Sequence, residues 1–203
     1  MKNLVQKQLA QSIATLQAVL ADESITNTIV TIGELTANAM RSGHKLLVAG
    51  NGGSAADAQH LVAEFVVRLT VNRPALRAIA LTTDTSILTA AGNDFGYDTV
   101  FARQLEALGQ PGDVFLGIST SGNSENILRA LTQTRLIGIT SIGLTGNGGG
   151  KMRPLCDYNI VIPSSVTMNI QESHLALEHI FCMVVERCTF GPDFDTQPQI
   201  LSE

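Results

Sequence analysis

Apolar positions recur at helical spacing along the first part of the chain. Two runs share this spacing, the first from Leu4 to Leu20 and the second from Ile25 to Met40, and Gly43 ends the second. Polar residues fill the positions between them, as in helices that bury one face. We therefore expect two amphipathic helices over residues 1–42.

The next part of the chain alternates short apolar runs with helical patterns. Each apolar run ends in glycine or small polar residues, which indicates a buried strand that breaks into a turn. A helix is expected after the first turn, from about Ser54 to Leu69. The segments expected to form a strand and the turn after it are KLLVAGNGG (45–53), LRAIALTTD (76–84), DVFLGISTSG (113–122) and ITSIGLTGNGGG (139–150), and YNIVIP (158–163) adds a last strand.

Alternating strands and helices predict a doubly wound α/β fold, with a five-stranded, mainly parallel sheet covered by helices on both faces. In such sheets ligands bind beyond the carboxyl ends of the strands. We expect one domain: N-terminal helices over 1–42, an α/β core over 43–190 and a tail over 191–203.

The segment Asn169–Cys188 is apolar almost all round, so a helix formed by it needs burial on several sides. Because one sheet cannot cover this helix and both N-terminal helices, we expect these helices to pack in an oligomer.

Composition narrows the class of partner. The formal net charge is -5, the 13 lysines and arginines are scattered, and tryptophan is absent, so nucleic acid is not expected as a partner. Gln and Lys interrupt the apolar positions of the N-terminus, which therefore lacks the pattern of a signal peptide or membrane span. We expect a cytoplasmic protein without a membrane partner. Its three cysteines form no C-x-x-C pair and are expected to be reduced.

The glycine turn after the first strand, GNGGSAADA, loosely fits a dinucleotide-binding pattern through Gly50, Gly52 and Ala55. No acidic residue follows about 20 positions later, where a ribose would need one, and Asp84 lies too far along. A nicotinamide cofactor is therefore disfavoured, and no nucleotide triphosphate loop is present. The turn either exposes backbone N–H groups and the Ser54 hydroxyl to a polar substrate or only joins a strand to a helix.

A second polar turn, ISTSGNSENI, places Ser119, Thr120, Ser121 and Ser124 before a helix expected from about Asn123. Capping needs one hydroxyl, whereas four hydroxyls and a helix N-terminus can hold a phosphate monoester without Lys or Arg. We favour a phosphate site over simple capping. Glu125 would repel a phosphate, so we expect it to face solvent.

Two helices carry candidate acid/base groups. His60 and Glu64 are four positions apart and share one helix face, and Gln171 and His179 lie on one line of the later helix. Such groups are usually a solvated stripe. If they meet across one pocket, they suit proton transfer between adjacent carbons or coordination of a divalent metal.

The segments NGGSAADAQH, GND (92–94), GDVFLGISTSGNS, LTGNGGG and IQESH together closely resemble sugar isomerase (SIS) domain proteins, and phosphoheptose isomerases most closely. The resemblance spans almost the whole chain. It implies a flavodoxin-like fold and a cytoplasmic homotetramer with active sites at subunit interfaces. The implied reaction converts D-sedoheptulose 7-phosphate to D-glycero-D-manno-heptose 7-phosphate, the first step of ADP-heptose synthesis for the lipopolysaccharide core.

The resemblance also implies roles for individual residues. Glu64 and His179 match the catalytic base and acid. Four residues match ligands of a divalent metal, zinc in members of the family: His60, Glu64, Gln171 and His179. The implied substrate contacts, together with the pocket residues expected above, are Asn51, Gly52, Gly53, Ser54, Glu64, Asn93, Asp94, Ser119, Thr120, Ser121, Ser124 and Gln171.

Two other functions stay open. A non-catalytic SIS protein that binds the bacterial replication initiator lacks the catalytic pair, whereas this chain retains Glu64 and His179. A sugar-phosphate sensor would bind the same phosphate without converting its sugar.

Overall fold

The computed structural model describes residues 1–191, so all but the first residue of the predicted tail lies outside the described part of the chain. The five strands are β1 (Leu46–Gly50), β2 (Ala78–Ala80), β3 (Val114–Ser119), β4 (Thr140–Thr145) and β5 (Tyr158–Val161). The helices are α1 (Lys2–Ala21), α2 (Glu23–Arg41), α3 (Gly53–Val66), α4 (Thr85–Asp94), η1 (Tyr97–Thr99), α5 (Val100–Leu108), α6 (Glu125–Ile137), η2 (Asn147–Met152) and α7 (Thr167–Phe190).

The strands form one parallel sheet in the order β2-β1-β3-β4-β5. Leu46 pairs with Ala78 on one side and with Val114 on the other, so β1 lies between β2 and β3. The chain leaves β1 toward β2 and returns to β3 on the opposite side. Strand order therefore reverses between β1 and β3, which is where a doubly wound fold opens a ligand crevice. The predicted fold class is confirmed.

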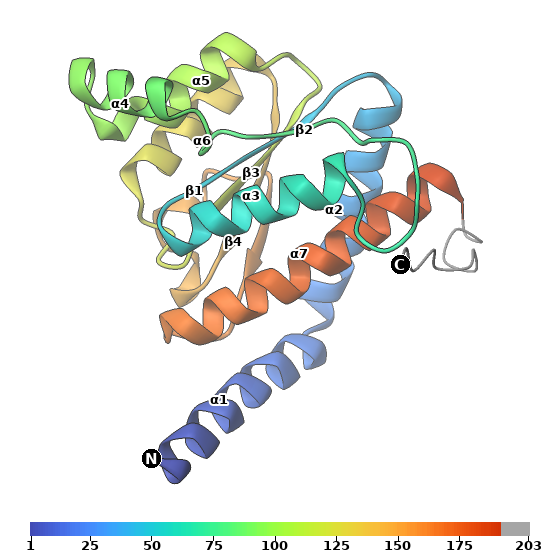
Figure 1. The fold of residues 1–203 in the computed structure, drawn as a ribbon, viewed down its shortest axis with the longest axis vertical. Helices are drawn as coiled ribbons and strands as arrows, with labels where there is room; N and C mark the ends of the chain where they lie inside the picture. The colour runs from blue at the N-terminus through green and yellow to red at the C-terminus, as the bar shows by residue number, and fades with distance from the viewer. Residues whose placement is uncertain (192–203) are drawn as a thin grey trace, which may run out of the picture.

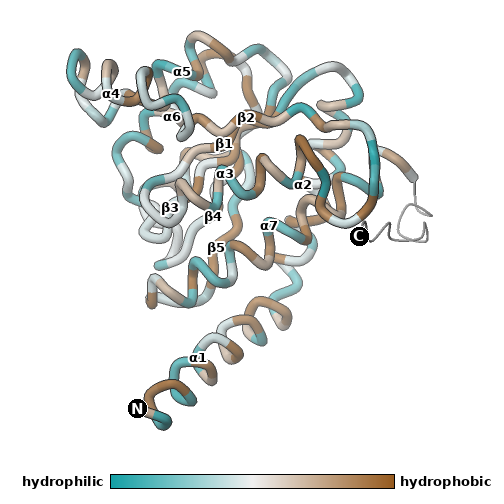
Figure 2. The backbone as a smooth tube through the Cα atoms, viewed as in Figure 1, coloured by the Kyte–Doolittle hydropathy of each residue, from teal (hydrophilic) through white to brown (hydrophobic). Residues whose placement is uncertain are grey.

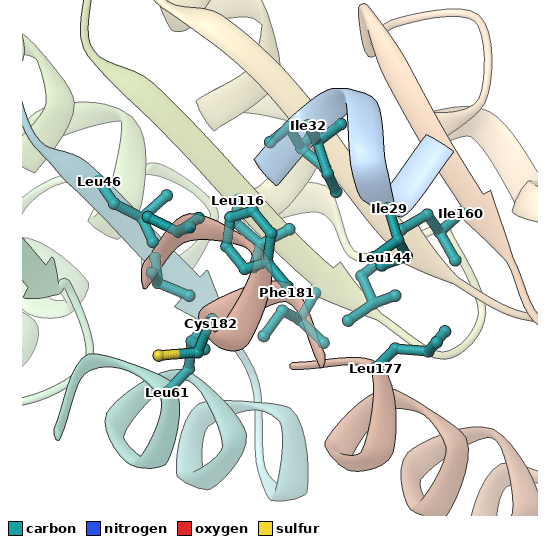
Figure 3. Close-up of a cluster of buried hydrophobic side chains, with 14 of the residues drawn as sticks. Ile29, Ile32, Leu46, Leu61, Leu116, Leu144, Ile160, Leu177, Phe181 and Cys182 are labelled. Atoms are coloured by element: carbon teal, nitrogen blue, oxygen red, sulfur yellow. The ribbon is translucent and has the colours of Figure 1, made fainter. Parts of the chain in front are cut away.

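Alternate residues of each buried strand feed two separate cores. Leu46 and Val48 point to the face covered by α2, α3 and α7, while Leu47 and Ala49 point to the face covered by α4, α5 and α6. Figure 3 shows the first core, in which Phe181 of α7 lies among side chains from the strands and from α2. Because α3 and α7 cover the same face of the sheet, their side chains meet above it.

Three boundaries differ from the sequence predictions. Helix α3 ends at Val66, three residues before the predicted end, where Val67 leaves helical geometry and the Leu76 N–H donates to the Phe65 carbonyl. Strand β2 keeps only three residues, because it is an edge strand that pairs with β1 alone. Helix α6 begins at Glu125 rather than near Asn123.

Helix α1 extends away from the rest of the protein (Figure 1). Among its residues, all of which the structure describes, Val19 alone is buried. Brown apolar segments alternate with polar ones along the helix in Figure 2. The exposed large apolar side chains of α1 are Leu4, Val5, Leu9, Ile13, Leu16 and Leu20.

Within residues 1–191, no helix combines the length and the apolar character needed to cross a membrane.

Candidate active site

A hollow of about 260 Å³ opens at the carboxyl ends of β1 and β3. We call it the hydroxyl hollow, because most of its polar lining groups are hydroxyls. The structure brings seven of the predicted substrate-binding residues together there and adds Thr167, which the sequence reasoning missed. The lining residues are Asn51, Ser54, Ile118, Ser119, Thr120, Ser121, Ser124, Thr167 and Gln171.

The hydroxyl of Ser124 does not cap the helix that it precedes. Its Oγ instead shares a hydrogen bond with Ser119 Oγ at 2.9 Å, and Ser119 Oγ lies 3.5 Å from Ser121 Oγ. No side chain in the described part of the chain caps the N-terminus of α6. The positive end of the helix dipole thus faces three clustered hydroxyls, which is the arrangement that binds an anion. Glu125 is exposed and pairs with Arg129, as expected for a residue that faces solvent.

A second glycine-rich loop, residues 146–150, packs against the polar turn that carries the hydroxyls. Gly122 has a φ of +65°, and a Cβ on it would lie 2.1 Å from the carbonyl oxygen of Gly149. The Met152 N–H donates to the Gly122 carbonyl, and the Lys151 N–H donates to Asn123 Oδ1. The segment LTGNGGG, predicted only as a strand end, therefore holds the hydroxyl-bearing turn in place. Its run of glycines was the signal for this close approach.

The side chains of Asn51 and Asn126 form a reciprocal pair. Each amide nitrogen donates to the other residue's Oδ1, at 2.9 and 2.8 Å, and the Tyr97 hydroxyl donates to Asn51 Oδ1 at 3.3 Å. Asn126 is buried on α6, so this pair ties the end of β1 to α6. Sequence reasoning missed Asn126 and Tyr97, because nothing local to them shows a partner 75 or 46 positions away.

Gly53 and Ser54 begin α3, where Gly53 lies against Gln171 of α7. A Cβ on Gly53 would lie 2.3 Å from Gln171 Nε2, so the absence of a side chain lets Gln171 reach into the hydroxyl hollow. Ser54 is buried and lines the same hollow. Gly52 has a φ of +57° and open space around it, so its position is exposed beside the hollow.

Further along the same two helices lies a group that we call the imidazole cluster, made of His60, Glu64 and His179. His60 Nε2 lies 2.8 Å from His179 Nε2 and 3.6 Å from Glu64 Oε1. The two imidazole rings meet edge to face, with centroids 5.1 Å apart. The structure thus joins residues of α3 and α7 that the sequence could place only on separate helices.

The imidazole cluster has the donor set of a divalent metal site. One ligand atom from each of its three residues lies within 4.8 Å of the other two, and two imidazole nitrogens with one carboxylate suit zinc. The residues therefore fit the metal that the family resemblance implies. Gln171 lines the hydroxyl hollow two turns before His179, and its assignment as a fourth ligand stays a prediction.

Ionisable groups with shifted pKa values lie on the same helices as the imidazole cluster. Burial raises the pKa of Glu178 to about 8, with a smaller effect from Asp57, and neither carboxylate oxygen of Glu178 has a hydrogen-bond partner among residues 1–191. Burial lowers the pKa of His174 to about 4, although His174 Nε2 lies 3.1 Å from the Thr145 carbonyl. Burial also raises the pKa of Asp57.

Asn93 and Asp94 do not line the hydroxyl hollow. They lie exposed at the end of α4, where Asn93 Nδ2 donates to Asp94 Oδ1 at 2.7 Å. Their predicted contact with substrate is untested by this arrangement and stays a prediction.

Comparison with known proteins gives the family. The SIS domain matches residues 8–146. The chain is 50% identical to a phosphoheptose isomerase of Aneurinibacillus thermoaerophilus, over 96% of this chain and 98% of that protein. It is 51% identical to phosphoheptose isomerase 2 of Campylobacter jejuni, with the same coverage. A solved phosphoheptose isomerase from Neisseria gonorrhoeae superposes with a TM-score of 0.86 at 40% identity, covering 91% of this chain and 98% of that one. The chain therefore belongs to the SIS domain family and, within it, to the phosphoheptose isomerases, which are phosphosugar isomerases.

Proposed function

We propose that this protein converts D-sedoheptulose 7-phosphate to D-glycero-D-manno-heptose 7-phosphate, the entry step of ADP-heptose synthesis for the lipopolysaccharide core. The observation that carries the proposal is the placement of the hydroxyl hollow and the imidazole cluster along the same pair of helices, α3 and α7. One region suits a phosphate and the other suits proton transfer. An isomerase of phosphorylated sugars needs both.

The phosphate binds in the hydroxyl hollow. Ser119, Ser121 and Ser124 donate hydrogen bonds, and the uncapped N-terminus of α6 adds its dipole. No charged side chain is required, so the hollow holds the far end of the substrate without competing for the protons of the reaction. Asn51, Gly52 and Gly53 are proposed to contact the sugar, and Asn93 and Asp94 are proposed to do so from α4.

The reacting carbons lie at the imidazole cluster. On α3, Ser54 of the hollow precedes His60 of the cluster by six residues, about 9 Å along the helix axis, a distance that an extended seven-carbon sugar phosphate spans. Glu64 removes the proton from the carbon beside the carbonyl, which gives an enediol. His179 protonates the carbonyl oxygen as the enediol forms. The aldose results when Glu64 returns a proton to the former carbonyl carbon and His179 takes the proton of the other hydroxyl. The hydrogen bond between His60 and His179 sets the orientation of the catalytic imidazole.

His60, Glu64 and His179, with Gln171 as a fourth ligand, are proposed to hold zinc. When bound there, a divalent cation supplies a positive charge that polarises the carbonyl and stabilises negative charge on oxygen. A tightly ligated carboxylate is a poor base, and an imidazole nitrogen bound to a metal carries no proton. Ligation therefore competes with proton transfer at both Glu64 and His179, and with the hydrogen bond between His60 and His179. Comparing turnover with and without a chelator separates the two roles.

We further propose that the active protein is a cytoplasmic homotetramer with active sites at subunit interfaces. The exposed apolar side chains of α1 support assembly. Six large apolar side chains of this projecting helix contact water in the single chain, and packing against another subunit would bury them. Light scattering over a range of protein concentrations tests this, and a monomer at every concentration would contradict it.

The proposed function is tested by measuring aldose formation from D-sedoheptulose 7-phosphate, with unphosphorylated sedoheptulose as the matched substrate. We expect turnover of the phosphate ester and a much higher KM for the free sugar. Binding of the ester without conversion would instead indicate a sugar-phosphate sensor. Neither binding nor conversion, together with direct binding of the replication initiator, would indicate the non-catalytic scaffold.

A further inference from the structure

Arg73 lies in the extended segment between α3 and β2, and its guanidinium is completely buried. The Nη2 group donates to the Glu64 carbonyl at 2.6 Å, and Nη1 donates to the Phe65 carbonyl at 2.8 Å. The Nε group donates to Glu186 Oε1 of α7 at 2.5 Å. A single side chain thus joins the last turn of α3, which includes the Glu64 backbone, to Glu186 of α7.

These contacts fill a specific need of α3. The last carbonyl groups of a helix have no partners within the helix, and cationic groups near them are favourable. The last turn of α3 contains no basic residue of its own, so the cation comes from Arg73, beyond the helix end. A planar guanidinium can donate to two adjacent carbonyls and a carboxylate together, which the single ammonium of lysine cannot match.

Glu186 balances the charge of this arrangement. Its side chain is 2% exposed, and that of Arg73 is 0% exposed, so each buried charge depends on the other. Glu186 lies on α7, seven residues beyond His179. The Arg73–Glu186 pair therefore sets the distance between the helix that carries Glu64 and the helix that carries His179.

We propose that Arg73 is a positioning residue for Glu64. It holds the backbone of the last turn of α3 against α7, so that the Glu64 carboxylate stays in register with the His179 imidazole. Its effect on turnover rests on the proposed function, in which Glu64 removes a proton. Its effect on the geometry of α3 does not.

The test compares Arg73→Lys with Arg77→Lys. Arg77 also donates to a backbone carbonyl after a helix, from Nη1 to the Gly43 oxygen at 2.7 Å, but this carbonyl follows α2, so the contact involves neither α3 nor α7. Steady-state kinetics gives kcat and KM, and hydrogen exchange read by mass spectrometry reports on residues 60–66. The double variant Arg73→Met with Glu186→Met removes both charges together and avoids a lone buried charge.

We expect Arg73→Lys to lower kcat about 10- to 100-fold while KM changes by less than about twofold, because small misplacements of a reacting group lower kcat. Exchange in residues 60–66 should become at least about tenfold faster. The folded double variant should show the same pattern, and Arg77→Lys should show neither change.

Unchanged kcat and exchange in Arg73→Lys would overturn the proposal. An equal loss of kcat in Arg77→Lys would also overturn it. So would the failure of both Arg73 variants to fold, because Arg73 would then stabilise the whole protein rather than position Glu64. If the wild type does not convert the phosphoheptose, the proposed function fails, and the exchange of residues 60–66 alone decides the positioning role.

Discussion

The hydroxyl hollow and the imidazole cluster lie on the same helices but are built in different ways. The loop of the hollow takes Ser119, Ser121 and Ser124 from six consecutive positions and uses neutral hydroxyls with a helix N-terminus. The cluster joins His60 to His179 across 119 positions and uses groups that titrate. The proposed phosphate site is thus encoded by one short segment. The proposed proton-transfer site depends on how two distant helices pack.

The supports of the two regions differ as well. Backbone contacts of Gly122 and Gly149 hold the hollow, where no side chain fits between the loops. Buried ionisable side chains lie on or against the two helices that carry the cluster, among them Arg73, Glu178 and Glu186. Changes at the hollow should therefore alter binding, whereas changes at the cluster should alter kcat, stability and pH dependence.

The largest effect is expected from Glu64→Gln. This variant keeps the shape of the side chain but removes the proposed base, so kcat should fall by roughly 10²- to 10⁴-fold while KM stays close to that of the wild type. Steady-state kinetics with the phosphoheptose measures both constants. Glu106→Gln, on the exposed surface of α5, is the matched control and should behave as the wild type. Full turnover by Glu64→Gln would show that Glu64 is not the base and that proton removal does not take place at the cluster.

Glu178→Gln should change how stability depends on pH. The pKa of Glu178 is raised by burial from 4.5 to about 8, so the folded protein keeps its proton after the unfolded chain has lost it. Wild-type stability from this group is therefore complete below about pH 4.5 and is lost as the pH rises toward 8. The variant has no such loss, and its advantage at pH 8 should be on the order of a few kcal/mol.

Urea unfolding at pH 5 and pH 8 measures this difference, with Glu34→Gln on the exposed face of α2 as the control. If the free energy of unfolding depends on pH equally in the wild type and in Glu178→Gln, the Glu178 carboxyl does not make the stability of the cluster's helices depend on pH. The contrast with the uncharged hollow would then fail.

Added zinc should stabilise the wild type through the imidazole cluster. A ligand at 100 times its dissociation constant stabilises by about 2.7 kcal/mol, which raises the Tm by several degrees. His60→Ala should lose most of this shift, because it removes one of the three ligands. His44→Ala, an imidazole change outside the cluster, should keep it. The same zinc shift in His60→Ala and the wild type would argue against a metal site there.

The smallest effects are expected at the hollow. Ser124→Ala should weaken substrate binding by about 1–2 kcal/mol, which is measured as a higher KM. It should leave the free energy of unfolding nearly unchanged, because the Ser124 hydroxyl does not cap α6. Asp84→Ala should do the reverse. Asp84 Oδ1 accepts the Ile87 N–H at 2.9 Å, so losing this cap should cost about 1 kcal/mol of stability without changing KM. If Ser124→Ala loses stability as Asp84→Ala does, the hydroxyls serve the helix and not the substrate.

The sequence predicted the hollow better than the cluster for a physical reason. A strand, a polar turn and a helix are contiguous, so Ser119 and Ser124 could be assigned to one site before any tertiary contact was known. Helical spacing placed His60 beside Glu64, but only the packing of α3 on α7 brings His179 to them. No local pattern marked Arg73 or Asn126, because both act through partners far away in the chain.

The most direct test of the account follows solvent deuterium by NMR during conversion of D-sedoheptulose 7-phosphate in D₂O. The account predicts that the wild type incorporates deuterium at the former carbonyl carbon, which is protonated when the enediol becomes the aldose. It also predicts that Glu64→Gln binds the substrate without this incorporation. Product that still carries no deuterium after many turnovers at equilibrium would show that the hydrogen does not pass through an exchangeable base. That result would contradict the role assigned to Glu64 and the imidazole cluster.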